Sequence, residues 1–580
     1  MFATGYVTRS LAAYKMISEA TAKKNGRTEE DGHDTPVVFW CNGCNVPIIH
    51  EVSTTTKCIC PSCGCGIKHL CSDIRPVFPE ERLLIEILLG IPLEWRDKSV
   101  WATNNRYYVD GKSVLISLRK FRDAALENVR LALTQYKSQN TYDAFNGMIA
   151  RFVHANVRRL DWLEDESFSF IKATAKPYFH DQIVVSFSGG KDSTVTADLA
   201  VRALGDPGLV HIFGNTTLEF PLTLDYVRRF RRNQPHMIFK TAVNKDQEFY
   251  EVCKDIGPPA RMLRWCCSMF KTGPITRVLS NLYHDKSILT YYGIRKCESV
   301  SRSRYNRVES SADAVKIQKQ KVASPIFHWL DIDIWLYLLG KGVDFNDAYR
   351  LGYDRVGCWC CPNNNARASF LSQIYMPEQA EKWREFLIDF ARRIGKPDAE
   401  EYVDSGAWKA RQGGNGVGAA QDVKIRFTNC TTEDHAKVYQ LNKPMDDMFL
   451  ELFIPFGRLA PELGRKLIHE TIVVDVRTGV PVLSIQPFGK EESEYAVKIK
   501  TLNVADHDAL QRMVGYQIKK SNACRRCLKC ESLCRHGAIS IVGGVYHINN
   551  AKCTRCKMCM MDKYLEGGCL MQKYLKTKDI

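Results

Sequence analysis

The stretch Ile183-Val-Val-Ser-Phe-Ser-Gly-Gly-Lys-Asp-Ser193, which continues into Thr194–Leu204, decides the fold of this chain. Its first five residues are mostly apolar, as in a buried strand of a parallel sheet. The residues after Ser193 follow a helical pattern that stops at Gly205, with Pro207 beyond. A strand, a glycine turn and a helix start, in this order, direct backbone N–H groups at a phosphate. The stretch therefore predicts a phosphate-binding loop in an α/β domain.

Each position of this loop has a role in binding phosphate. The glycines let the backbone approach closely, the lysine supplies charge, the serines supply hydroxyl donors, and the aspartate caps the helix or helps hold Mg²⁺. A Walker A loop needs Ser or Thr directly after Gly-Lys, and here an aspartate intervenes. The alternative is a plain glycine turn. We expect a phosphate loop of another class, formed by Ser188, Gly189, Gly190, Lys191, Asp192 and Ser193.

Further short apolar runs surround the loop. Leu209–Phe213 and Ile288–Tyr292 are bounded by Gly, Pro or Asp and alternate with helical patterns from Gln182 to about Arg411. Such alternation is typical of parallel strands joined by helical crossovers. We expect an α/β domain with a doubly wound, mostly parallel sheet over residues 166–412.

Four ordered elements resemble one known superfamily. The loop is similar to the PP-loop of ATP pyrophosphatases, which cleave ATP between its α- and β-phosphates. Thr216-Thr-Leu-Glu-Phe-Pro221 resembles the Thr-Gly-x-Glu-Phe-Pro element of the phosphoadenylylsulfate (PAPS) reductase superfamily, with Thr217 where glycine is usual. Gly293-Ile-Arg295 with Glu298-Ser299, and then 325–335, resemble its next two elements. The resemblance covers about residues 182–408 and implies that Arg295 contacts a nucleotide.

The loop also separates branches of that superfamily. True PAPS and adenylylsulfate reductases no longer keep Gly-Gly-Lys-Asp, whereas ATP-using members do: sulfate adenylyltransferase subunits, tRNA thiolases and DNA phosphorothioation enzymes. This chain keeps the string and does not end in the reductases' Glu-Cys-Gly-x-His. The resemblance therefore favours ATP with Mg²⁺ over a sulfonucleotide. It also implies that Lys191, Asp192 and Arg295 carry the chemistry.

The 23 cysteines are clustered. Without a secretory signal, such clusters indicate metal ligation rather than disulfides. Adjacent Cys266-Cys267 and the later Gly357-Cys-Trp-Cys-Cys-Pro362 resemble the [4Fe–4S] ligation of adenylylsulfate reductases and phosphorothioation enzymes. The resemblance implies the ligands Cys266, Cys267, Cys358 and Cys361, with Cys360 spare. A zinc site or a redox disulfide at these positions is the alternative.

The last cysteines have ferredoxin spacing. Cys524-x₂-Cys-x₂-Cys-x₃-Cys534 is followed by Cys553-x₂-Cys-x₂-Cys559 and by Cys569. In two-cluster ferredoxins the fourth cysteine of each run binds the other cluster. We therefore expect two [4Fe–4S] clusters, one held by Cys524, Cys527, Cys530 and Cys569, the other by Cys534, Cys553, Cys556 and Cys559. Zinc knuckles are the alternative.

The first cysteines have zinc-ribbon spacing. Cys41-x₂-Cys44 and Cys60-Pro-Ser-Cys63-Gly have the form of two zinc knuckles, which predicts one structural Zn²⁺. Three further cysteines leave the choice of ligands open: Cys58, Cys65 and Cys71.

Length and composition predict several units rather than one core. No run approaches the ~20 apolar residues of a membrane span, and we expect a cytoplasmic protein. The formal charge of +16 falls to roughly +8 if four thiolate-bound sites each carry about −2, which is compatible with nucleic acid or with nucleotides alone. The expected order is an N-terminal lead (1–35), a zinc ribbon (36–75), an accessory α/β and helical region (76–165), the PP-loop domain (166–412), a flexible glycine-rich linker (413–418), a small α/β domain (422–515) and a ferredoxin domain (516–580).

Together these features predict an enzyme that uses ATP, releases pyrophosphate and activates an acceptor as an adenylate for sulfur transfer or reduction. Its expected partners are an adenine nucleotide, an external electron donor and a tRNA or DNA acceptor, with no membrane. One alternative is a true sulfonucleotide reductase that makes sulfite with electrons from the ferredoxin domain. The other is a non-catalytic, nucleic-acid-binding redox sensor.

Overall fold

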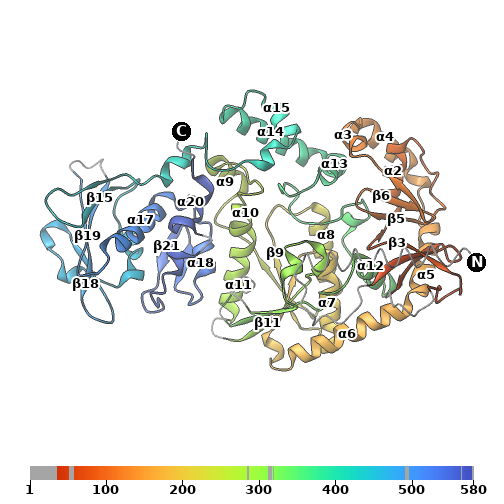
Figure 1. The fold of residues 1–580 in the computed structure, drawn as a ribbon, viewed down its shortest axis with the longest axis horizontal. Helices are drawn as coiled ribbons and strands as arrows, with labels where there is room; N and C mark the ends of the chain where they lie inside the picture. Colours follow the sequence, from red (N-terminus) through yellow and green to blue (C-terminus); the bar gives the residue numbers. More distant parts are fainter. Residues whose placement is uncertain are drawn as a thin grey trace, which may run out of the picture.

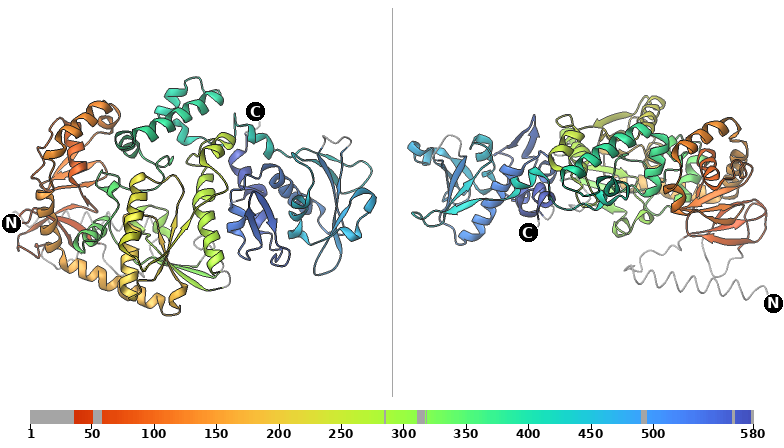
Figure 2. Two further views of the ribbon diagram at one scale, coloured as in Figure 1. Left: turned by 180° about the vertical axis from the view of Figure 1, so that it is seen from behind. Right: turned by 90° about the horizontal axis from the view of Figure 1, so that it is seen from above.

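The computed structural model describes residues 36–50, 58–283, 286–310, 317, 319–489, 495–562 and 565–577, so the expected N-terminal lead lies outside the described residues. Figures 1 and 2 show an N-terminal part, a central sheet with its helices, and a C-terminal part in one row. None of the described helices is long and apolar enough to cross a membrane.

The N-terminal part holds two small antiparallel sheets followed by helices. The three-stranded sheet has the order β2-β1-β3, and the four-stranded sheet has the order β4-β5-β6-β7. Their elements are β1 (Val37–Cys41), β2 (Val46–His50), β3 (Ile67–Cys71), β4 (Arg75–Pro76), α2 (Pro79–Leu89), β5 (Val100–Thr103), β6 (Arg106–Val109), β7 (Lys112–Leu115), α3 (Leu118–Arg122), α4 (Leu126–Tyr136), α5 (Asp143–Ala155) and α6 (Val157–Ala175).

The central sheet is doubly wound, which confirms the α/β prediction. Its order is β10-β9-β8-β11-β13-β12, with only the edge strand β12 antiparallel. From β8 the chain adds β9 and β10 on one side, and it then returns to add β11 and the remaining strands on the other side of β8. The point where the strand order reverses, at which α/β sheets bind ligands, therefore lies at the carboxyl end of β8. The strands are β8 (Ile183–Phe187), β9 (Val210–Gly214), β10 (Ile238–Ala242), β11 (Ile288–Tyr292), β12 (Val308–Glu309) and β13 (Gln320–Ala323).

Alternate residues of these strands enter different cores. Val185 and Phe187 join the core that also contains α7 and α8, whereas Val184 joins a smaller core with Leu279 of α11. This period of two explains why the strands are apolar throughout: both faces are covered. The helices of this domain are α7 (Lys191–Leu204), α8 (Pro221–Asn233), α9 (Phe249–Ile256), α10 (Trp265–Cys267), α11 (Gly273–Tyr283), α12 (Asp331–Gly340), α13 (Ala366–Tyr375), α14 (Pro377–Arg393) and α15 (Ala399–Asp404).

The C-terminal part joins a six-stranded antiparallel sheet to a small unit rich in cysteine. The sheet order is β14-β15-β19-β18-β17-β16, and β17 and β18 form a hairpin. The elements are β14 (Phe427–Asn429), β15 (Ala436–Gln440), α16 (Asp447–Glu451), β16 (Arg458–Ala460), β17 (Thr471–Val474), β18 (Pro481–Pro487), β19 (Ala496–Thr501), α17 (His507–Ala523), α18 (Lys529–Leu533), β20 (Ile539–Val542), β21 (Val545–Ile548), α19 (Met558–Met561) and α20 (Leu570–Leu575).

The structure corrects two expectations about domain boundaries. The predicted boundaries at 165–166 and 515–516 fall inside α6 and α17, because each helix packs its apolar side continuously against both neighbours. The predicted glycine-rich linker is a packed segment: the N–H of Gly414 donates to the carbonyl of Lys576, and a Cβ at Gly413 would lie 2.5 Å from that oxygen. Glycine serves there for close backbone approach rather than for flexibility.

The cysteine-rich unit docks firmly against the central domain. Helix α11 lies beside α18 (Figure 1), and its Arg277 forms a two-bond ion pair with Glu531 at 2.9 and 3.1 Å. Arg277 also donates to the carbonyl of Ile541 at 2.6 Å. A Cβ at Gly273 would lie only 2.5 Å from Cβ of Leu528, so the two backbones nearly touch. The unit is therefore fixed relative to the central sheet.

Candidate active site and cysteine clusters

The phosphate loop joins β8 to α7 in the conformation its sequence predicts. Gly189 has φ +72°, and a Cβ there would lie 2.9 Å from the side chain of Thr223, so only glycine fits. The hydroxyl of Ser193 accepts from the N–H of Ser188 at 3.1 Å and donates to the carbonyl of Gly190 at 2.8 Å. The N–H of Lys191 donates to the hydroxyl of Tyr349 at 3.0 Å. These contacts fix the loop at the start of α7.

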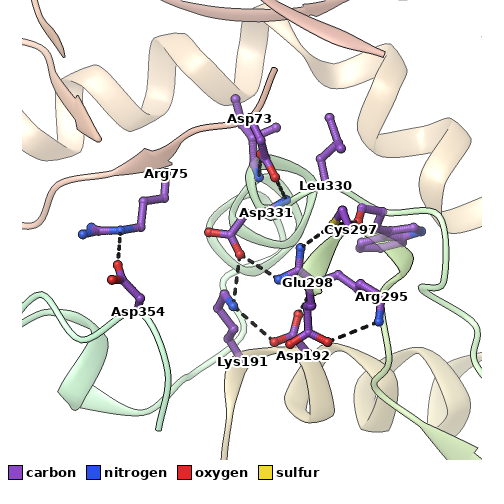
Figure 3. A network of polar contacts seen from close by, with 12 residues as sticks. Asp73, Arg75, Lys191, Asp192, Arg295, Cys297, Glu298, Leu330, Asp331 and Asp354 are labelled. Carbon is purple, nitrogen blue, oxygen red and sulfur yellow. Dashed lines mark hydrogen bonds and ion pairs between the residues drawn. The ribbon is translucent and has the colours of Figure 1, made fainter. Parts of the chain in front are cut away.

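Two buried cations and two carboxylates meet beside the loop (Figure 3). Lys191 Nζ lies 3.1 Å from Asp192 and 3.0 Å from Asp331. Arg295 lies 2.5 Å from Asp192 and 2.9 Å from Asp331. The structure thus brings together Lys191, Asp192 and Arg295, which the sequence predicts as site residues, and adds Asp331. Lys191 and Arg295 are each only 4% exposed.

The charges in this network stabilise one another. Burial alone would lower the pKa of Lys191, but Asp192 and Asp331 raise it above its ordinary value. Burial alone would raise the pKa of Asp192, but Lys191 and Arg295 lower it to about 2. All four groups are therefore ionised at neutral pH, and their charges cancel.

The segment that follows the first cysteine cluster reaches into this network. Both carboxylate oxygens of Asp73 cap α12, accepting from the N–H groups of Asp331 at 2.8 Å and Ile332 at 3.1 Å. Burial, together with the nearby charge of Asp331, raises the pKa of Asp73 to about 7. Two residues on, Arg75 donates to Asp354 at 3.1 Å, on the segment that leads to Cys358 (Figure 3). Residues 73–75 therefore connect the N-terminal part with both sites.

Sequence reasoning missed several residues of the network. Asp331 is the first residue of α12 and lies within the last matched element, 325–335. An acidic residue in the first turn of a helix is a common signal of a helix start, so its local pattern does not mark it as a site residue. Cys297 lies between Arg295 and Glu298; its thiol accepts from Arg295 and donates to the carbonyl of Trp329, both at 3.3 Å. No local signal marks Asp73, because its partners lie 258 and 259 positions away.

The second matched element lies between the loop and the cysteines. Thr217 adopts φ +63°, the conformation for which glycine is the usual residue, and its N–H donates to the side chain of Asn215 at 2.8 Å. The hydroxyl of Thr216 donates to Glu219 at 2.8 Å and lies 3.4 Å from the sulfur of Cys358. This element therefore touches the cysteine set of the central domain.

The sequence pattern of the phosphoadenosine phosphosulfate reductase domain matches residues 182–364. This stretch is therefore similar to a PAPS reductase domain, and below the name PAPS reductase domain refers to residues 182–364 by that similarity. The adenosine 5'-phosphosulfate reductase of Staphylococcus epidermidis is 25% identical over 225 residues, which are 37% of this chain and 86% of that enzyme.

Two uncharacterised proteins of Methanocaldococcus jannaschii are also similar, at 34% identity over 47% of this chain and 31% over 45%. The chain spans 55% and 60% of the length of these two proteins. A crystal structure of PAPS reductase from Candida auris aligns with a TM-score of 0.27 at 20% identity, over 35% of this chain and 95% of that one.

Two pairs of cysteines meet inside the PAPS reductase domain. Cys266 and Cys267 lie on α10, and Cys358 pairs with Glu219 in an isolated β-bridge. The pKa of Cys266 is raised by its hydrogen bond with Cys267, by burial, and then by the charges of Cys267 and Cys358. The same hydrogen bond lowers the pKa of Cys267 to about 5, with help from Arg264. Cys361 is near enough to Arg264 and Cys358 to affect both.

The ferredoxin-like cysteines lie close to one another. Burial raises the pKa of Cys527 well above its ordinary value, and its next strongest influences are Cys569, Cys530 and Cys524. Burial likewise raises the pKa of Cys559 to about 12; Lys520 opposes this shift, and Cys530, Cys534 and Cys553 add to it. The neighbours of Cys527 all belong to its own predicted set, whereas Cys559 has neighbours from both sets. A cavity is lined by Cys534, Cys553, Cys556 and Cys559.

One aromatic side chain joins two of the cysteine sets. Burial raises the pKa of Tyr574 to about 12, and Cys527, Cys267 and Cys266 add to the shift. Its hydroxyl therefore lies within electrostatic reach of both the ferredoxin-like unit and the cysteines of the PAPS reductase domain. With the Leu528–Gly273 contact, this places the two sets next to each other.

The first cysteines fit a single metal ion. Sulfur atoms of Cys41 and Cys63 lie 3.4 Å apart and those of Cys44 and Cys60 3.7 Å apart, and all four lie within 4.8 Å of one another. Tetrahedral Zn–S bonds of about 2.3 Å put sulfurs about 3.8 Å apart. Within the described part of the chain, no other three Cys, His, Asp or Glu ligand atoms gather so closely. The other cysteine sets therefore do not have single-ion spacing.

Proposed function

We propose that this chain is an iron–sulfur PP-loop enzyme that binds ATP with Mg²⁺, releases pyrophosphate and activates an acceptor oxygen as an adenylate for sulfur transfer or reduction. Ser188, Gly189, Gly190 and Ser193 surround the phosphates, and Lys191 stabilises charge on the pyrophosphate as it leaves. Arg295 holds the nucleotide beside Asp192 and Asp331. A tRNA or DNA is one class of acceptor.

The observation that carries this proposal is the cancelled charge beside the phosphate loop. Lys191 and Arg295 are already matched by Asp192 and Asp331, all within 3.1 Å. A polyphosphate placed there meets carboxylates as well as cations, and burial makes an uncompensated charge costly. Asp192 and Asp331 are the carboxylates that would hold Mg²⁺, whose preferred ligands are oxygens.

The cysteine sets support the proposed cofactors. Cys41, Cys44, Cys60 and Cys63 have the spacing for Zn²⁺, and three [4Fe–4S] clusters suit the remaining sets: Cys266, Cys267, Cys358 and Cys361; Cys524, Cys527, Cys530 and Cys569; Cys534, Cys553, Cys556 and Cys559. Such clusters, when bound, supply one-electron chemistry. The buried contact of Leu528 with Gly273 and the position of Tyr574 support a relay from the C-terminal unit into the PAPS reductase domain.

A true sulfonucleotide reductase is the second candidate. It is favoured by the docking of the C-terminal cysteines against the cysteines of the PAPS reductase domain, since reduction of a sulfonucleotide to sulfite consumes electrons. The similarity to an enzyme named adenosine 5'-phosphosulfate reductase also supports it.

Pyrophosphate and sulfite measured in parallel separate the two candidates. Anoxically prepared protein is given ATP or PAPS, with Mg²⁺, a reductant and candidate acceptors. We expect AMP and pyrophosphate from ATP. Lys191→Ala should lower the chemical step by roughly 10²–10³-fold, as for loss of one oxyanion donor, whereas Arg295→Ala should mainly weaken nucleotide binding. Sulfite released from PAPS at full rate without ATP would refute the ATP proposal and establish the reductase.

A further inference from the structure

The two C-terminal cysteine sets differ in their access to solvent. In the set Cys524, Cys527, Cys530 and Cys569, the last three are each at most 7% exposed. In the other set, Cys556 is exposed and both Cys534 and Cys553 are half-buried. The buried set is also the one beside Tyr574 and Gly273. Of the two sets, the one that contains Cys556 is therefore the one accessible to an external electron donor.

The surface around that set is basic. The 28 residues from Cys534 to Met561 contain two arginines, two lysines and no Asp or Glu; Glu531 before them pairs with Arg277, and half-buried Asp562 follows directly after them. Arg535 and Lys552 are exposed, each next to a cysteine of the set, whereas Arg555 and Lys557 are half-buried between its members. From a neighbouring element, Glu451 is bonded to His547 and to the N–H of Ile548, on the hairpin strand β21. We call Arg535, Lys552, Arg555, Lys557, Met558 and Met561 the entry surface.

The apolar part of the entry surface favours a protein partner. Met558 and Met561 are 40% and 61% exposed, and exposed methionines are a feature of adaptable protein docking sites. A single-stranded nucleic acid would need exposed aromatic rings for base stacking. The only aromatic ring other than histidine between Cys534 and Met561 is Tyr546, and it is buried.

We propose that the entry surface docks an acidic, low-molecular-weight electron-carrier protein, which gives one electron per encounter to the cluster held by Cys534, Cys553, Cys556 and Cys559. The carrier is oxidised by one electron and the chain is reduced by one. Positive charge on the chain and negative charge on the carrier steer their encounter, so docking weakens as salt increases. This inference rests on the electron relay of the proposed function.

The test uses the full-length, iron-reconstituted chain and a reduced acidic 2[4Fe–4S] ferredoxin as the probe. The variant is Arg535→Glu with Lys552→Glu. Its matched control is Lys466→Glu with Arg477→Glu, which changes two exposed cations in the connections before and after β17 of the six-stranded sheet by the same total charge. Binding is measured by calorimetry at several salt concentrations, and reduction of the chain by stopped-flow absorbance without nucleotide or acceptor.

At low salt we expect the entry-surface variant to bind the ferredoxin at least about tenfold more weakly than the control variant. Reduction by dithionite, a small reductant that needs no docking, should be equal in all forms. Equal ferredoxin binding by both variants, or tighter binding of a basic cytochrome c than of the ferredoxin by the unaltered chain, would overturn the proposal. Loss of binding to an RNA oligonucleotide with unchanged ferredoxin binding would assign the surface to nucleic acid instead.

This test is independent of the nucleotide reaction. If the chain takes electrons from the ferredoxin but makes no pyrophosphate, the ATP proposal is refuted and the entry-surface proposal stands. If dithionite reduces the chain but the ferredoxin does not, the relay hypothesis stands and the entry-surface proposal is refuted.

Discussion

Replacing Asp73 tests whether the N-terminal part sets the geometry of the nucleotide site. Asp73 accepts two hydrogen bonds from the first turn of α12, at 2.8 and 3.1 Å, and the residue that it caps, Asp331, holds Lys191 and Arg295. Asp73→Ala leaves those N–H groups without their acceptor. Loss of a helix N-cap costs about 1 kcal/mol, in a range of roughly 0.5–2. If the whole of this free-energy cost appears as weaker nucleotide binding by a displaced Asp331, affinity for Mg·ATP drops by about fivefold.

The assay is equilibrium dialysis of labelled ATP with Mg²⁺, with the folded state checked by near-UV circular dichroism. Asp73→Asn is the matched control: its amide oxygen can accept from one of the two N–H groups, whereas its NH₂ group cannot accept from the other. We expect Asn to restore part of the affinity that Ala loses. An Asp73→Ala protein that is folded and binds ATP within twofold of the unaltered chain would refute the reasoning. So would equal losses in Ala and Asn.

Two further predictions concern the C-terminal unit and the second matched element. Lys520 is 1% exposed, donates to the carbonyl of Cys559 at 2.6 Å and is influenced by thiols of both C-terminal sets. Because Lys520→Met removes this buried positive charge, it should make the reduction potentials of both clusters more negative than the exposed control Lys573→Met does. Equal reduction potentials for the two variants in an EPR-monitored titration would exclude this role. Thr217→Gly should stabilise the PAPS reductase domain by up to about 1 kcal/mol, because glycine adopts the φ of +63° without strain, although the unfolded chain gains conformational entropy. A lower melting temperature of the variant would contradict that account.

The sequence predicts those parts of the structure that depend on neighbouring residues. The strand, glycine turn and helix around Lys191 follow from local apolar pattern and glycine sterics, and the Cys41 set follows from knuckle spacing. By contrast, the cap of α12 by Asp73 joins residues 258 positions apart, and nothing in their local pattern marks a buried acidic group. The same holds for Gly414, whose contact with Lys576 depends on how two distant segments pack. A glycine run has one composition whether it is flexible or closely packed.

The start of α8 connects the phosphate loop with the cysteine set of the central domain. Its first turn follows Thr216–Phe220, the element that touches Cys358, and its Thr223 lies against Gly189 of the phosphate loop. Asn346 strengthens the second contact by donating to both the carbonyl of Gly189 and the hydroxyl of Thr223. A change at the cysteines therefore has a short, buried path to the loop through one helix end. In an enzyme that activates an acceptor and then reduces or thiolates it, the two steps must meet at one substrate. The segment 216–223, which ends in the first turn of α8, contacts both the loop and the cysteine set.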